Sequence, residues 1–89
     1  FRYDIAICNP PFHSNNGKNI ELGKSFISAA KYILKSGGNL LLVANIQLPY
    51  EKTVTELFNE YTIPAENKYF KIILAKRPKT RYDSPQLKI

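Results

Sequence analysis

The feature that most constrains the fold is a continuous apolar run, Asn39-Leu40-Leu41-Leu42-Val43-Ala44. Because this run does not alternate with polar residues, it predicts a central parallel strand covered on both faces. A second apolar stretch at residues 3–8 predicts another strand. Helical periodicity lies between the two stretches. Strand, helix and strand in this order predict an α/β fold with a right-handed crossover.

Residues 20–35 predict an amphipathic helix that serves as scaffold. Its apolar side chains recur at helical spacing, in a stripe that Ile27 and Leu34 widen: Leu22, Phe26, Ala29, Ala30 and Ile33. Ser36-Gly37-Gly38 predict the end of this helix, because glycine readily takes the left-handed conformation of a C-cap.

The later part of the chain predicts a second helix and a hairpin. Leu48-Pro49-Tyr50 opens the helix, whose buried face repeats at Tyr50, Val54, Leu57 and Phe58. Residues 61–63 and 69–75 predict two antiparallel strands at the sheet edge, joined by Glu66-Asn67-Lys68. Tyr69 and Phe70 are interpreted as packing residues, and Arg77-Pro78 as the end of the last strand.

The first predicted strand runs into a rigid corner, Asn9-Pro10-Pro11-Phe12. Proline fixes φ, lacks an N–H and favours extended geometry in the residue before it, so the corner carbonyls are held with few competing donors. Asn9 adds a carbonyl acceptor, and Phe12 adds a flat apolar face. The corner therefore suits a planar base with an exocyclic amine, although the same residues are typical of an ordinary turn.

Three single residues near the strand ends have two interpretations each. His13 either contacts a base or phosphate or is a solvated loop histidine. Because no acidic or cysteine partner lies near it in the sequence, neither a metal site nor a catalytic triad is predicted. Asn45 follows the central run, level with the Asn9 corner, and either lines the site or caps a loop. Cys8 is interpreted as a small buried hydrophobe rather than a reactive thiol. Being the single cysteine, it predicts no internal disulfide and a cytoplasmic protein.

The stretch from Asp4 to His13 resembles the catalytic motif of class I S-adenosylmethionine-dependent amino-methyltransferases. The form with Phe and then His is most similar to the ribosomal RNA small-subunit guanine-N2 methyltransferases. Further blocks share that likeness in the same order: Ser36-Gly37-Gly38, Val43-Ala44-Asn45, Leu48-Pro49-Tyr50 and Tyr69-Phe70-Lys71-Ile72. The four-residue motif alone also fits methyltransferases of adenine, cytosine and glutamine. The later blocks favour guanine N2.

The resemblance implies a Rossmann-like sheet of about seven strands, of which the chain supplies the later ones. Residues 1–78 would be the carboxy-terminal portion of a catalytic domain, and residues 79–89 a basic, flexible tail. The implied cofactor is S-adenosyl-L-methionine, the implied partner is ribosomal RNA or the small ribosomal particle, and no metal is implied. Asn9 and Pro10 would be catalytic, with Asn9 also near the cofactor. Pro11, Phe12, His13 and Asn45 would bind the substrate.

The family binds its cofactor mainly through a Gly-rich loop after its first strand and an acidic residue after its second. Neither is present in these 89 residues, because Gly37-Gly38 follow a helix rather than a strand. We therefore expect the isolated chain to be inactive and to bind the cofactor very weakly. Residue 1 enters a strand directly and is not methionine, so we expect a piece of a longer protein.

The charge distribution leaves a different class of function open. Net charge is +6; from Lys76 onward there are five basic residues and one acidic residue, and residues 1–75 carry +2. A basic end suits a phosphate backbone, but it is also typical of a solvated tail. A non-catalytic RNA-binding or assembly module is thus the alternative, besides methylation of adenine or protein glutamine. We also expect an uncovered sheet edge that favours self-association, and no apolar run is long enough to cross a membrane.

Overall fold

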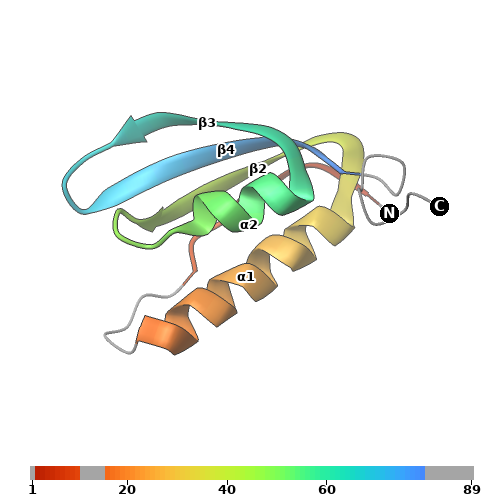
Figure 1. Cartoon of the computed structure of the whole chain (residues 1–89). Helices are drawn as coiled ribbons and strands as arrows, with labels where there is room; N and C mark the ends of the chain where they lie inside the picture. The colour runs from red at the N-terminus through yellow and green to blue at the C-terminus, as the bar shows by residue number, and fades with distance from the viewer. Residues whose placement is uncertain (1, 11–15, 80–89) are drawn as a thin grey trace.

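A mixed four-stranded sheet with two helices makes up the fold (Figure 1). The computed structural model describes residues 2–10 and 16–79. In chain order the elements are β1 (Tyr3–Cys8), α1 (Asn16–Ile33), β2 (Leu34–Asn45), α2 (Tyr50–Leu57), β3 (Phe58–Glu66) and β4 (Phe70–Pro78). The predicted α/β class and the order strand, helix, strand, helix, hairpin are confirmed. Neither described helix is long and apolar enough to cross a membrane.

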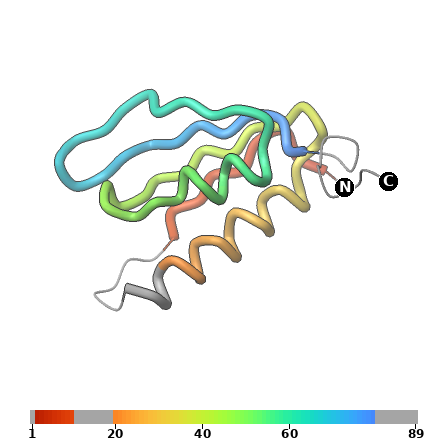
Figure 2. The backbone as a smooth tube through the Cα atoms, viewed as in Figure 1, coloured from red at the N-terminus to blue at the C-terminus, as the bar shows by residue number. Residues whose placement is uncertain are grey.

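The strand order is β1-β2-β4-β3, with β1 parallel to β2 and with β4 antiparallel to both of its neighbours. The chain path in Figure 2 shows the hairpin of β3 and β4 beside β2. The predicted hairpin at the sheet edge is confirmed, although both strands are longer than expected. Its turn is held by Asn67, whose side-chain oxygen accepts the N–H groups of Tyr69 and Phe70, each at 2.8 Å.

The core lies between the sheet and the two helices, which cover the same face (Figure 1). Leu40, Leu42 and Ala44 of β2 point into it and are at most 4% exposed. Leu41 and Val43 alternate with them and are only half-buried. Within the described residues no helix packs on that second face. The predicted cover on both faces of β2 is therefore wrong for this part of the chain, because both described helices pack on one side.

The helix α1 differs from its prediction in length and in rotation. It begins at Asn16 and ends at Ile33, and the side chains facing the core are those of Ile27 and Ala30, followed by Leu34. Leu22, Phe26 and Ile33 of the predicted stripe stay 37–40% exposed. The physical reason is Gly23, which lies against the ring of Tyr50 where no Cβ fits. The apolar periodicity that predicted this helix gives no weight to glycine. The close approach of Gly23 to Tyr50 nevertheless decides which face of the helix turns toward the core.

Gly37 and Gly38 do not cap the helix, contrary to prediction. Both lie in β2, and no described glycine has a positive φ. Leu34 already pairs with Tyr3, and residues 35–38 bulge out before Asn39 pairs with Ile5. Gly38 is needed for space: a Cβ there would come within 3.0 Å of the Lys35 carbonyl oxygen and 3.1 Å of the Asp4 carbonyl oxygen. At the same end of the sheet, β4 ends at Pro78 as predicted, after Arg77 at φ 57°.

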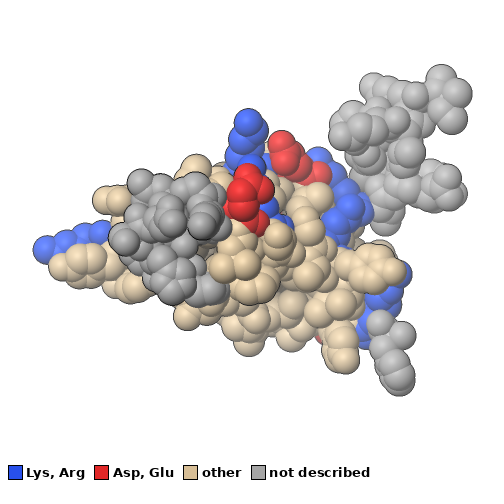
Figure 3. Space-filling model, turned by 90° about the horizontal axis from the view of Figure 1, so that it is seen from below, with Lys and Arg blue, Asp and Glu red and all other residues tan. Residues whose placement is uncertain are grey.

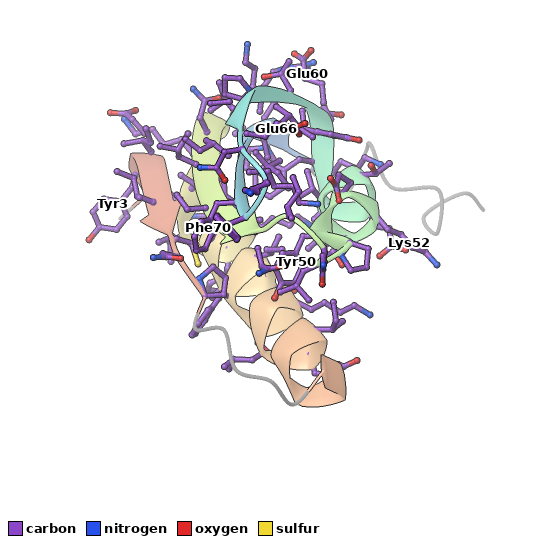
Figure 4. The ribbon with its side chains drawn as sticks, turned by 90° about the vertical axis from the view of Figure 1, so that its left-hand side faces the viewer. Tyr3, Tyr50, Lys52, Glu60, Glu66 and Phe70 are labelled. Atoms are coloured by element: carbon purple, nitrogen blue, oxygen red, sulfur yellow. The ribbon has the colours of Figure 1, made fainter. Side chains whose placement is uncertain are left out.

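The outer edge of β1 has no neighbouring strand among the described residues. Tyr3, Ile5 and Ile7 are 53–71% exposed there, and Tyr3 points away from the rest of the sheet (Figure 4). An uncovered edge with large apolar side chains is a template for pairing with another chain.

We therefore predict that the isolated chain self-associates through β1. Ile7→Lys should shift the chain toward monomer in analytical ultracentrifugation, because a charge on an edge strand opposes pairing. The matched control is Ile63→Lys on β3, the opposite edge of the sheet, which should leave association unchanged. A monomeric parent chain with a sharp, high-temperature unfolding transition would contradict the prediction.

Candidate functional site

The carboxyl ends of β1 and β2 meet at one edge of the sheet, because the two strands are parallel and Cys8 pairs with Leu42. Directly after β1, Pro10 is buried and Asn9 is exposed. The buried proline ring fixes the backbone, and the exposed carboxamide faces solvent at the edge where ligands bind in open α/β sheets. Pro11, Phe12 and His13 lie outside the described residues, so their substrate contacts remain predictions.

Asn45 ends β2 at the same edge, but further along the strand than Asn9. By the β1–β2 register, Asn9 would lie opposite Val43, two residues before Asn45. The side-chain oxygen of Asn45 accepts the N–H of Gln47 at 2.9 Å, and its carbonyl oxygen accepts the N–H of Leu48 at 3.1 Å. Of the two interpretations left open by the sequence, the structure supports the loop cap: Asn45 holds the turn from β2 into α2.

Two weakly acidic groups lie beneath the corner, Cys8 and Tyr50. Burial raises the pKa of the Cys8 thiol, which therefore stays protonated near neutral pH and is a poor nucleophile. Burial, and to a lesser extent the neighbouring Cys8, raise the pKa of Tyr50, whose side chain is 1% exposed. Figure 4 looks onto this end of the sheet, with Tyr50 above α1. The sequence predicts Cys8 as a small buried hydrophobe; in the structure it is only partly buried, packed against the core.

An ion pair fixes the first turn of α2 to the sheet. Lys71 of β4 is 5% exposed, and its Nζ lies 2.7 Å from Oε2 of Glu51, whose side chain is 28% exposed. Lys71 lies opposite Ala44 in the ladder, one residue before Asn45. Sequence reasoning missed this lysine, although its spacing of two from the inward-facing Ile73 and Ala75 was the available signal. The pairing neutralises the buried cation beside the site.

Tyr69 and Phe70 were predicted as packing residues, and this is wrong. They are 61% and 48% exposed. Phe70 pairs with Asn45, and the carbonyl oxygen of Tyr69 accepts the N–H of Ile46 at 2.8 Å. The physical reason is position. The turn between β3 and β4 extends beyond the ends of both helices (Figure 1), so no helix covers the start of β4, where Phe70 lies at the candidate edge (Figure 4). A cavity of about 280 Å³ borders Phe70 and Val43.

The described polar groups at this edge include the Asn9 carboxamide and the Lys71–Glu51 ion pair. Within residues 2–10 and 16–79, no group of three or more His, Cys, Asp or Glu side chains comes together to hold a metal ion. Buried side-chain nitrogen and oxygen atoms in the same ranges all have hydrogen-bond partners.

Comparison with known proteins gives a consistent result. The family model for the methyltransferase small domain matches residues 1–74. The chain is 35% identical over 75 residues to a ribosomal RNA small subunit methyltransferase C of Shewanella denitrificans, covering 84% of this chain and 22% of that protein. It is 38% identical over 72 residues to a ribosomal RNA large subunit methyltransferase G of Pseudoalteromonas atlantica, covering 81% and 19%.

A solved structure agrees with this result. The 16S rRNA N2 G methyltransferase RsmC of T. thermophilus, in complex with AdoMet and guanosine, superposes with a TM-score of 0.74 at 29% identity. The superposition covers 85% of this chain and 20% of that one. The chain spans about a fifth of the length of the curated relatives it matches.

Proposed function

Because the chain belongs to the methyltransferase small domain family, we propose that it carries the acceptor-base half of the active site of an S-adenosylmethionine-dependent rRNA guanine-N2 methyltransferase. The observation that carries the proposal is the exposed Asn9 on a buried Pro10, at the carboxyl edge of two parallel strands. The relatives are rRNA methyltransferases, which supports rRNA as substrate, and the similar solved structure is an N2 G methyltransferase in complex with guanosine, which supports guanine N2.

The chemistry follows from the weak nucleophilicity of the exocyclic amine. The N2 lone pair of guanine is delocalised into the ring. The side-chain oxygen of Asn9 and the carbonyl oxygen of Pro10 accept hydrogen bonds from the two N2–H groups. These hydrogen bonds localise the N2 lone pair toward the methyl donor. Phe12 stacks the base, and Pro11 and His13 border it. As N2 gained the methyl carbon and the carbon–sulfur bond of the donor broke, positive charge would grow on N2 and these acceptors would bind its hydrogens more strongly. One of the two N2 protons would then leave to solvent.

The described residues fit the acceptor base better than the cofactor. When bound, S-adenosylmethionine would supply the methyl group. The exposed Asn9 carboxamide can face both ligands, and Lys71 is paired with Glu51, so no unpaired buried cation opposes a sulfonium. A Gly-rich loop and an acidic residue for the rest of the cofactor are absent from the sequence. The remaining contribution of the chain is to orient the base and exclude water from it.

We assign the substrate to rRNA in general rather than to the rRNA of one ribosomal subunit, since the relatives include methyltransferases of small-subunit and of large-subunit rRNA. The base must leave its helix to reach Asn9, because the exocyclic amine of a stacked guanine is not accessible in line. An rRNA substrate and a single, protonated cysteine both agree with a cytoplasmic protein.

We predict that the 89-residue chain binds S-adenosylmethionine with a Kd in the millimolar range or weaker, because the Gly-rich loop and the acidic residue that mainly hold the cofactor in this family are absent from its sequence. Isothermal titration calorimetry of the folded chain measures this. The control is the longest natural form of the protein, which should bind in the micromolar range. Low-micromolar binding by the 89-residue chain would contradict the proposal that the chain carries the acceptor-base half of the site and lacks most of the cofactor half.

A further inference from the structure

A cavity of about 470 Å³ lies at the other end of the sheet from Asn9. The start of β1, the last turns of α1, the start of β2 and the ends of α2 and β4 meet around it. Its apolar lining comes from Leu34, Leu57 and Pro78, and the described part of the chain begins and ends beside it, at Arg2 and Lys79 (Figure 2). The proposed methyl transfer does not use this cavity.

Three cations line the cavity, Arg2, Lys31 and Lys79, and no acidic residue does so among the described lining residues. None of the three forms an ion pair within the described part of the chain. Arg2 is held in place, because its Nη1 donates to the Leu34 carbonyl oxygen at 3.3 Å. Figure 3 shows Lys and Arg side chains at this end of the molecule. Such a cluster attracts an anion.

An aromatic ring completes the cavity. Tyr32 is 79% exposed, and the Arg2 guanidinium lies 6.0 Å from the centroid of its ring. A large ring held in water beside a cation is available for stacking, and every base has a π-face. The sequence continues after Lys79 with further basic residues, Arg81 and Lys88. Cations, a stacking ring and an apolar floor together match a nucleotide within a single strand better than a bare phosphate.

We propose that this cavity binds one nucleotide of a single-stranded RNA segment, with the phosphate at Arg2, Lys31 and Lys79 and the base stacked on Tyr32. This inference rests on the proposed rRNA substrate but concerns a different nucleotide from the methylated one. The six residues of β1 separate the cavity from the Asn9 corner, a span of roughly 20 Å at about 3.3 Å per residue. The cavity therefore holds RNA that flanks the acceptor guanosine.

The test uses a fluorescent uridine decamer, which contains no guanine acceptor, and the longest natural form of the protein. Tyr32→Ala should weaken binding at least about fivefold in fluorescence anisotropy, whereas Tyr32→Phe keeps the ring and should bind like the parent. Lys31→Ala should weaken binding and lower the salt dependence by about 0.7, the value for one phosphate contact on a single strand. The charge control is Lys52→Ala, at an exposed lysine on α2, and this variant should bind within twofold of the parent.

Pocket variants that bind like the parent, or a Lys52→Ala loss as large as that of Lys31→Ala, would overturn the assignment. So would competition by uridine 5′-monophosphate as strong as that by the unlabelled decamer, because the site would then take a free nucleotide. The methylated product is identified separately with guanine-containing rRNA. Binding changes without N2-methylguanosine would leave the cavity assigned and refute the function. Formation of N2-methylguanosine without binding changes in the cavity variants would support the function and refute the cavity assignment.

Discussion

Asn9→Ala in the longest natural form should lower the single-turnover rate of rRNA methylation by about 10²–10³-fold, as loss of one preorganised polar contact does elsewhere. The substitution removes one acceptor for the N2 hydrogens but leaves the buried Pro10 and the strand before it unchanged. The lost interaction strengthens as charge develops on N2, so the loss falls on the chemical step. RNA affinity should fall little, because phosphate contacts dominate it.

The measurement uses saturating RNA and cofactor, so that binding differences do not enter the rate. The matched control is Asn59→Ala, an exposed asparagine on β3 whose side chain donates to the Arg77 carbonyl oxygen at 2.8 Å. It should methylate at the parent rate. If Asn9→Ala also does so, Asn9 is only a turn residue.

Gly23→Val should lower the free energy of unfolding by about 2 kcal/mol, within the range for overpacking a filled core. Any Cβ at residue 23 overlaps the ring of Tyr50, which is 1% exposed and cannot move aside into solvent. A small gain in helix propensity over glycine offsets part of this cost. For a domain of this size the midpoint of thermal unfolding should fall by roughly 10 °C.

Differential scanning calorimetry of parent and variant measures the change. Gly37→Val is the matched control, because a Cβ at residue 37 meets nothing within 4 Å. It should leave the unfolding midpoint within a degree or two of the parent. Equal midpoints for Gly23→Val and the parent would show that the Gly23–Tyr50 contact does not set the rotation of α1.

The sequence predicted those parts of the fold in which a local pattern and its packing agree. The Leu40–Ala44 run, the helical spacing from Tyr50 to Phe58 and the hairpin before Pro78 each predicted an element that is present. Prediction failed where tertiary contact decided the outcome. Gly23 turned α1 away from its most hydrophobic stripe, and Gly38 serves a close approach rather than a helix cap.

The candidate site was predictable in part for the same reason. Asn9 and Pro10 are placed by a strand end and by proline geometry, both of which are local. The role of Asn45 depends on whether its oxygen meets Gln47, and the sequence could not decide that. The burial of Lys71 and the exposure of Phe70 depend on where the helices end over the sheet. The cationic cavity joins five segments, and no single stretch of sequence shows it.

The most direct test of the central claim is the identity of the methylated product. The longest natural form is incubated with rRNA transcribed in vitro, which carries no modification, and with methyl-labelled S-adenosylmethionine. The RNA is then digested to nucleosides and analysed by mass spectrometry. We expect label in N2-methylguanosine, and Asn9→Ala should reduce it. Label in methyladenosine, or RNA that is bound but unlabelled, would contradict it.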